Sequence, residues 1–260
     1  MTEPDTDCMR NRDKWKPSKY VYQNGRLIGS RNRGEVGVGS RLIVDLVASV
    51  YDTNLRSHAR GRLLDLGCGN VPLLSTYEHF VQEITCVDWE HTLHKNEYLD
   101  YRCDLTKRLP FADGEFDTII LSDVLEHLPQ PEHLWSEMSR VVAERGRIIV
   151  NVPFYYWIHE PPYDYYRYTE FALRRFVEMS GLRLIQLDSI GGAPEIVDDI
   201  VAKNIASVPV IGELLAMFVQ WLTLSFTGTK YGKKLSQATS AAFPFAYFLV
   251  AEKPAAISID

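Results

Sequence analysis

The sequence has few cysteines, no large excess of positive charge and no apolar run at its start, and each shortage excludes a class of protein. Four of the 260 residues are cysteines, Cys8, Cys68, Cys86 and Cys103, and none has the paired spacing of a zinc site. We therefore expect reduced thiols in a cytoplasmic protein. The 28 basic and 34 acidic side chains give a net charge of −6, so general nucleic-acid binding is not expected. The polar, charged N-terminus predicts no signal peptide.

A third glycine is also missing from the most informative turn. Residues 62–70, Arg-Leu-Leu-Asp-Leu-Gly-Cys-Gly-Asn, predict a short buried strand that runs into a glycine-rich turn. A turn that holds a dinucleotide pyrophosphate would have glycine at position 72, where this chain has Pro72. A carboxylate in the turn repels phosphate but suits the ammonium and sulfonium groups of S-adenosylmethionine. The candidates for binding this cofactor are Asp65, Gly67, Cys68 and Gly69.

Polar side chains recur at the ends of the strands predicted next. Asp88 lies roughly twenty residues after the turn, the usual offset for a carboxylate that accepts both ribose hydroxyl groups. Trp89 beside it can stack on adenine, and Asp104, followed by Leu105, can accept the adenine amino group. Ser122 ends a further strand. The strands expected here are 84–89, 98–102, 116–122 and 147–152. Because they alternate with helical stretches, we predict an α/β fold whose parallel sheet has helices on both faces.

These motifs resemble those of the class I S-adenosylmethionine-dependent methyltransferases, in particular the broad type-11 group. The resemblance covers residues from about 60 to 190. It is carried by LLDLGCG at 63–69, VDW at 87–89, CDL at 103–105, LPFADGEFDTIILSDVLEHL at 109–128 and RVVAERGRIIVNVPF at 140–154. It implies a Rossmann-like, seven-stranded, mostly parallel sheet whose antiparallel last strand would be 243–252. It also implies S-adenosylmethionine as methyl donor, and it leaves the acceptor open.

Asp123, Glu126 and His127 form the first candidate group for chemistry at the methyl group. Their i, i+3, i+4 spacing predicts one face of a helix that begins after the fourth strand. Two carboxylates and an imidazole can bind Mg²⁺ or another divalent metal. The set resembles metal-dependent relatives, the ubiquinone-pathway and small-RNA ribose methyltransferases, in which the metal orients the acceptor hydroxyl groups and lowers their pKa. The alternative is that Glu126 orients His127 or caps the helix, and that no metal is bound.

The aromatic segment 152–169 is the second candidate. His159 is the preferred general base, because the ordinary pKa of imidazole, near 6.5, lies close to neutral pH; it can equally be a metal ligand beside His127. Aromatic rings with a neighbouring acid and arginine suit a sugar ring. The candidates for binding the acceptor are Tyr155, Tyr156, Asp164, Tyr165 and Arg167. The alternative is a structural loop in which Asp164 and Arg167 form only a salt bridge. Thr169 is predicted to cap the next helix.

The pattern His-Glu-Pro-Pro-x-Asp-x-x-Arg-x-Thr at 159–169 carries a further resemblance. It is similar to methyltransferases associated with bacterial surface-polysaccharide synthesis, which implies a glycan or nucleotide-sugar acceptor. The chain then divides into four predicted parts. These are a basic arm and packing helix at 1–58, the cofactor-binding core at 59–192, an apolar helical insertion at 193–242, and the last strand and tail at 243–260.

The two flanking parts each leave an alternative open. The arm is either a solvated tail or a lid whose cations hold an anionic substrate. Its cations are Arg10, Arg12, Lys14, Lys16, Lys19, Arg26, Arg31, Arg33 and Arg41. In the insertion, 205–226 has Glu213 as its only charged residue and nearly the length of a membrane span. We expect a helical subdomain that covers the substrate cleft or forms a homodimer, followed by a basic turn at Lys230, Lys233 and Lys234. Peripheral contact with a membrane is the alternative.

Taken together, the sequence predicts a cytoplasmic methyltransferase that methylates a sugar hydroxyl on a nucleotide-linked or lipid-linked glycan. In-line transfer from the sulfonium would be assisted by a histidine base. Other predictions remain open: a quinone precursor or small phenol as acceptor, with a metal if one binds, and a non-catalytic module that holds the cofactor. A nicotinamide-dependent oxidoreductase is disfavoured by Pro72.

Overall fold

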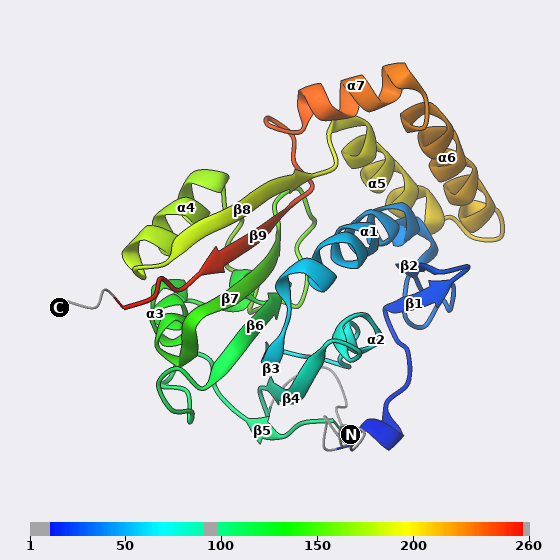
Figure 1. The fold of residues 1–260 in the computed structure, drawn as a ribbon. Helices are drawn as coiled ribbons and strands as arrows, with labels where there is room; N and C mark the ends of the chain where they lie inside the picture. The colour runs from blue at the N-terminus through cyan, green and yellow to red at the C-terminus, as the bar shows by residue number, and fades with distance from the viewer. Residues whose placement is uncertain (1–10, 91–97, 257–260) are drawn as a thin grey trace.

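One mixed sheet forms the centre of the molecule. The structure is a computed structural model that describes residues 11–90 and 98–256, so Cys8 and Arg10 lie outside it. Within this part, the strands lie side by side in the order β5 (Tyr101–Arg102), β4 (Val81–Asp88), β3 (Gly61–Leu66), β6 (Phe116–Ser122), β7 (Val142–Pro153), β9 (Ala246–Glu252) and β8 (Arg183–Ile190) (Figure 1). β9 runs antiparallel to both of its neighbours, and the other adjacent pairs are parallel. The predicted Rossmann-like α/β fold, with a seven-stranded sheet and an antiparallel last strand, is confirmed.

Helices cover both faces of this sheet. The central strands are continuous apolar runs, as in β6, where Ile119, Ile120 and Leu121 are fully buried. Side chains alternate between two cores along each strand. One core packs beneath α1 (Arg41–His58) and α2 (Leu74–Tyr77), and the other beneath α3 (Pro131–Val141) and α4 (Glu170–Met179) (Figure 1).

Several element ends differ from those predicted. β5 has two residues instead of five, because the Asp100 side chain accepts the Cys86 N–H at 2.8 Å in place of a backbone ladder bond. β7 begins at Val142, directly after α3, and β9 begins at Ala246. Thr169 is the N-cap of α4, as predicted, since its hydroxyl accepts from the Ala172 N–H at 3.3 Å.

The basic arm contains an unpredicted hairpin. β1 (Tyr20–Gln23) and β2 (Arg26–Gly29) are joined by Asn24 and Gly25, with φ of 51° and 74°. Positive φ at both positions is the two-residue turn for which Asn-Gly is the strongest sequence signal, so this element was readable in the chain. Short 3₁₀ turns, η1 (Arg12–Lys14) and η2 (Val38–Ser40), flank the hairpin.

Three helices, α5 (Ala193–Ala206), α6 (Gly212–Thr227) and α7 (Lys230–Thr239), connect β8 to β9, which confirms the helical insertion. They stand beyond one end of the sheet, with α5 beside α1 (Figure 1). The basic turn predicted at Lys230, Lys233 and Lys234 is wrong, because these residues lie in α7, whose first turn is capped by the Thr229 hydroxyl. Among the described residues, no helix combines the length and apolarity needed to cross a membrane.

Candidate active site

The glycine-rich turn lies where β3 ends, and its geometry depends on Gly67. This residue has φ of 68°, and a Cβ there would stand 2.5 Å from a methyl carbon of Val124. The N–H groups of Gly67 and Cys68 both donate to the carbonyl of Val87 on the neighbouring strand, at 2.8 and 3.0 Å. The turn is therefore fixed at the carboxyl edge of the parallel strands, where open α/β sheets bind ligands.

Two carboxylates support this turn. Asp65 is buried and accepts the Tyr77 hydroxyl at 2.9 Å. Burial, with the charge of Asp88 adding to it, raises the pKa of Asp65 to about 7. Asp88 ends β4 and accepts the Gly69 N–H at 3.1 Å. The two acids predicted to meet the cofactor thus lie near the ends of adjacent strands, and Asp88 bonds the turn directly.

The pKa of Asp65 predicts a pH dependence of cofactor binding. Because its pKa of about 7 lies above its ordinary value, the carboxyl is neutral at acid pH and ionised only above about pH 7. A cationic ligand favours the ionised form. We expect the affinity for S-adenosylmethionine to rise by about tenfold from about pH 6 to about pH 8. Calorimetric titrations of the wild type and of Asp65→Asn check this, since the variant should bind weakly with no such rise. An unchanged slope in the variant would contradict the role.

The other predicted cofactor residues are placed along the same edge. The Asp104 carboxylate accepts from Thr106 N and Oγ1 at 3.0 and 2.7 Å, and these bonds with Lys107 hold its pKa below the ordinary value. Leu105 is buried beside it. Ser122 accepts the Tyr51 hydroxyl at 2.6 Å. Their roles toward adenine and the methyl donor remain predictions.

The segment after β6 is not the predicted helix. Asp123 has φ of 54°, residues Leu125–His127 (η3) form one 3₁₀ turn, and α3 begins only at Pro131. Asp123 instead bonds Lys19 of the arm at 2.8 Å and the Asn151 amide at 2.7 Å. Burial opposes protonation of Lys19, but the charge of Asp123 outweighs it and raises the lysine pKa. The expected shared helical face of Asp123, Glu126 and His127 is therefore wrong, because Asp123 turns to the arm.

Glu126 and His127 meet His159 of the aromatic loop. Glu126 is fully buried, and its Oε1 lies 3.7 Å from His127 Nε2 and 3.5 Å from His159 Nε2. One ligand atom from each residue fits within 4.8 Å of the other two. Glu126, His127 and His159, hereafter the Glu–His–His centre, come from two segments that the sequence offered as separate candidates.

The hydrogen-bond partner of His127 favours one tautomer of that ring. His127 Nδ1 lies 3.0 Å from the Tyr163 carbonyl, which can only accept, so that nitrogen carries the hydrogen. His159 Nδ1 lies 3.4 Å from Asp164 Oδ2 and forms no hydrogen bond to any residue that the structure describes. The Nε2 atoms of both rings face Glu126, and a neutral His127 presents a lone pair there. Among the described residues, neither oxygen of Glu126 accepts a hydrogen bond. Three groups that can act as Lewis bases therefore converge, and a proton or another cation is needed between them.

The electrostatics of the Glu–His–His centre agree with this. Burial raises the pKa of Glu126, partly offset by His159. Burial alone would lower the pKa of His159, but Glu126 outweighs it and raises that pKa. The centre therefore favours the protonated form of His159 and stabilises the resulting imidazolium.

Asp164 and Arg167 support the loop. Arg167 donates to both Asp164 oxygens, at 2.5 and 2.8 Å, and to the carbonyls of Tyr156, Trp157 and Tyr166. Asp164 also accepts the backbone N–H of His159 at 2.9 Å. Arg167 lowers the pKa of Asp164 to about 2. The geometry favours the salt-bridge alternative for this pair. A direct contact with the acceptor remains a prediction that their present bonds do not support.

Of the predicted acceptor tyrosines, Tyr156 contacts a histidine. Tyr155 and Tyr165 are exposed, whereas Tyr156 is partly buried, with its ring 5.0 Å from that of His159. Tyr163 extends the loop in the other direction, because its ring meets Trp89 edge-on at 5.3 Å. The loop therefore reaches from the Glu–His–His centre to the strand end predicted to hold the ribose.

The arm reaches the same edge through Lys19, which the sequence named only as one of the arm's cations, and through Trp15, which it did not name. Besides the Lys19–Asp123 pair, the Trp15 indole N–H donates to the Val71 carbonyl in the glycine-rich turn at 3.0 Å. No local pattern marks Lys19. Asn151 carried a signal that was overlooked, since it is a polar residue within an apolar strand, and such residues need a buried partner.

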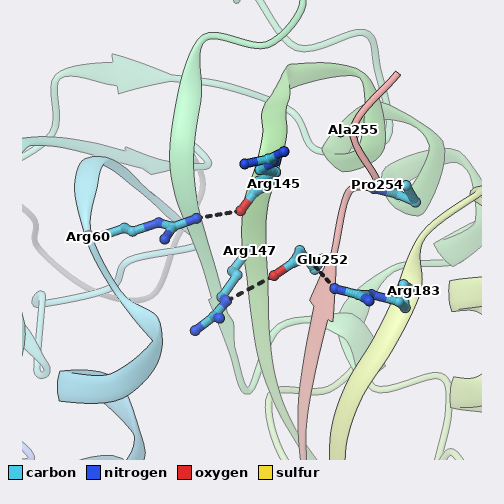
Figure 2. A pocket seen from close by; sticks show the side chains of 7 residues that line it. All are labelled: Arg60, Arg145, Arg147, Arg183, Glu252, Pro254 and Ala255. Atoms are coloured by element: carbon cyan, nitrogen blue, oxygen red, sulfur yellow. Dashed lines mark hydrogen bonds and ion pairs between the residues drawn. The ribbon is translucent and has the colours of Figure 1, made fainter. Parts of the chain in front are cut away.

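A hollow lies at the amino ends of the parallel strands, opposite the candidate site. Figure 2 shows Arg60, Arg145, Arg147 and Arg183 around Glu252, with Pro254 and Ala255. Glu252 accepts from Arg147 at 3.4 Å and from Arg183 at 2.5 Å, while Arg60 donates to the Arg145 carbonyl. These bonds tie β7, β8 and β9 together at the amino ends of the parallel strands. This hollow is therefore remote from the candidate site.

Comparisons with known proteins identify the core. The family model described as a methyltransferase domain matches residues 64–150. A phosphatidylethanolamine N-methyltransferase of Cereibacter sphaeroides is 30% identical over 101 residues, covering 35% of this chain and 49% of that protein. A ubiquinone biosynthesis O-methyltransferase of Chromobacterium violaceum is 29% identical over 108 residues, covering 36% and 45%. The chain thus spans about half the length of these curated relatives.

A solved structure extends the likeness to most of the fold. The S-adenosylmethionine-dependent methyltransferase from Archaeoglobus fulgidus has a TM-score of 0.52 and 16% identity, covering 82% of this chain and 97% of that one. At this identity the likeness shows the fold. Residues 64–150 thus match a methyltransferase domain, and the chain has the Rossmann-like fold of class I methyltransferases.

Proposed function

We propose that the protein transfers a methyl group from S-adenosylmethionine to an oxygen atom. The observation that carries this is the Glu–His–His centre, where two imidazole nitrogens meet a buried carboxylate. Val124, two residues before Glu126, contacts Gly67, so the centre adjoins the turn expected to hold the donor. A hydroxyl acceptor must lose its proton as the methyl arrives, and such a centre supplies the proton acceptor.

The chemistry then requires alignment and one proton transfer. The sulfonium is already a good leaving group, so the protein needs to hold the acceptor oxygen in line with the methyl carbon. The oxygen–methyl bond forms as the sulfur–methyl bond breaks, giving S-adenosylhomocysteine. The acceptor proton passes to Nε2 of His159, our first choice, or of His127. Glu126 stabilises the imidazolium, because its charge favours the protonated ring.

For the acceptor we propose a sugar hydroxyl on a nucleotide-linked or lipid-linked glycan. Support comes from the exposed rings of Tyr155, Trp157 and Tyr165, which belong to the same loop as His159, since aromatic faces stack on sugar rings. The second candidate is a phenol such as a quinone precursor, which the ubiquinone O-methyltransferase relative favours. We place the protein in the cytoplasm, where the free cysteines Cys68, Cys86 and Cys103 would stay reduced.

The test is a methyl-transfer screen with labelled S-adenosylmethionine, nucleotide sugars, lipid-linked sugars and small phenols. We expect label in the sugar acceptors, and a loss of about 10²–10⁴-fold in His159→Asn with donor affinity nearly unchanged. His127→Asn reports on the second ring. If label appeared only in the phenols, the proposed acceptor would be a phenol and not a sugar. Donor binding without transfer to any acceptor would favour the non-catalytic module.

As the alternative to proton transfer to a histidine, we propose that the Glu–His–His centre holds a divalent metal, in which case the histidines are ligands and not bases. The unpaired buried carboxylate and two neutral imidazoles are a donor set that such ions accept, whereas Asp123 is already paired with Lys19. Bound there, a metal would lower the pKa of an acceptor hydroxyl. Calorimetric titration of the chelator-treated protein with Mn²⁺ should give about one site per chain, lost in His127→Asn. Full activity after chelation, together with no Mn²⁺ binding, would contradict the proposal of a metal site.

A further inference from the structure

Helix α6 has its large apolar side chains on the outside. The residues it buries are small or polar: Gly212, Ala216 and Gln220. Its outward side chains are large and apolar, with Leu214, Phe218 and Trp221 between 53% and 65% exposed and Leu215, Leu222 and Leu224 also exposed. A surface helix of a globular protein normally has the opposite arrangement.

The packing fixes this orientation. The Gln220 amide accepts the Leu42 N–H at 2.9 Å and donates to the Val38 carbonyl at 2.7 Å. A side chain added at Gly212 would collide with the Ile205 carbonyl of α5. A helix rotated about its axis would break both buried hydrogen bonds and lose this close approach. The apolar side chains therefore stay outside.

Positive charge borders this apolar face at both ends. Lys230, Lys233 and Lys234 are exposed on α7, directly after α6. At the other end, Arg33 pairs with Glu213, the one acid of 205–242, and Arg41 contacts Met217. The chain as a whole carries a net charge of −6, whereas the exposed charges beside this apolar face are mostly positive.

We propose that the outer face of α6, with the lysines of α7, docks on the surface of an anionic phospholipid bilayer. Exposed tryptophan, phenylalanine and leucine beside lysine are the composition of helices that lie in the plane of a membrane surface. The lysines would meet anionic headgroups, each contributing electrostatic attraction. A symmetric pair of copies suits this face less well, because it sets the same surface against itself. The α7 lysines would then find no unpaired acid opposite them, since Glu213 is held by Arg33.

The aromatic loop touches the insertion that carries this face. Lys203 of α5 lies with its Nζ 4.0 Å from the ring centre of Tyr156 and 4.9 Å from that of Trp157. The insertion and the loop are therefore in contact. The docking itself does not depend on the proposed function. The further idea that the membrane presents a lipid-linked acceptor rests on that function.

The test is flotation of the full chain with vesicles of phosphatidylcholine alone or mixed with phosphatidylglycerol. The anionic vesicles should carry the protein and the neutral ones much less. Phe218→Ser with Trp221→Ser removes two exposed rings and should weaken the partition coefficient by about tenfold or more. Replacing the three α7 lysines by glutamine should weaken it by about fivefold per lysine and remove its dependence on salt. Phe171→Ser, at an equally exposed apolar residue of α4, is the matched control and should bind as the wild type.

Light scattering after size-exclusion chromatography separates the competing occupant. A wild-type chain that does not float with anionic vesicles overturns the proposal. So does a Phe218→Ser, Trp221→Ser variant, shown to be folded by circular dichroism, that floats like the wild type. A dimer that this variant converts to monomers, with no vesicle binding by either form, would assign the face to a second copy. Because no step is catalytic, these outcomes are independent of methyl transfer.

Discussion

Replacing Glu126 by glutamine should lower kcat by about 10²–10⁴-fold while the affinity for S-adenosylhomocysteine stays nearly unchanged. The substitution keeps the size of the side chain but removes the charge that raises the pKa of His159. A lower pKa makes this histidine a weaker base. The acid limb of the pH–rate profile should therefore move to lower pH, as fewer protons compete for Nε2 at a given pH.

The same variant should be at least as stable as the wild type. Within the described residues the buried Glu126 carboxylate accepts no hydrogen bond, so its charge is unfavourable for folding. We therefore expect Glu126→Gln to lose activity without a fall in melting temperature, because a buried charge that destabilises the fold is kept for catalysis. Glu132→Gln, at an exposed position in the first turn of α3, is the control and should change neither quantity. A Glu126→Gln enzyme with an unchanged pH–rate profile would contradict the role.

Gly67→Ala should destabilise the protein by about 2–4 kcal/mol and abolish measurable binding of S-adenosylhomocysteine. Two effects combine at this position. Gly67 has φ of 68°, which strains any residue with a Cβ, and that Cβ would stand 2.5 Å from Val124. Relief of the contact must displace either the turn or the segment that leads to Glu126.

Gly25→Ala separates the two effects. Gly25 has φ of 74°, but a Cβ added there meets nothing within 4 Å. Gly25→Ala should destabilise the protein by about 1–2 kcal/mol, from backbone strain alone. It should bind S-adenosylhomocysteine as the wild type does. Urea denaturation and calorimetry measure both quantities. Equal costs in the two variants, with binding retained in Gly67→Ala, would show that the close approach to Val124 has no role.

The strand ends and the glycine-rich turn of the expected cofactor site were predictable because their signals are local. Asp65, Gly67 and Asp88 lie at strand ends, and the strands themselves are marked by apolar runs next to turns. The Asn24-Gly25 hairpin was equally local and was overlooked. In each case neighbouring residues determine the backbone, so a short window of sequence holds the information.

The Glu–His–His centre was predicted only as an alternative, with His159 as a candidate metal ligand beside His127. Glu126 and His159 lie far apart in the chain, and they meet because the loop bonds the carbonyl of Glu126 through the N–H groups of Tyr165 and Tyr166. Asp123 fitted a helical spacing but is drawn away by Lys19 and Asn151, a tertiary effect that overrides local preference. Likewise, the composition of 205–226 suggested an apolar helix, but only the fold shows that its large side chains face outward.

Calorimetric titration of the full chain with S-adenosylhomocysteine tests most directly whether the carboxyl edge is a methyl-donor site. We expect about one site per chain with micromolar affinity, and a strong reduction in Asp88→Ala, because this carboxylate ends β4 beside the glycine-rich turn. Binding that is absent from a folded chain, with or without candidate acceptors, or that is unaffected by Asp88→Ala, would contradict this assignment.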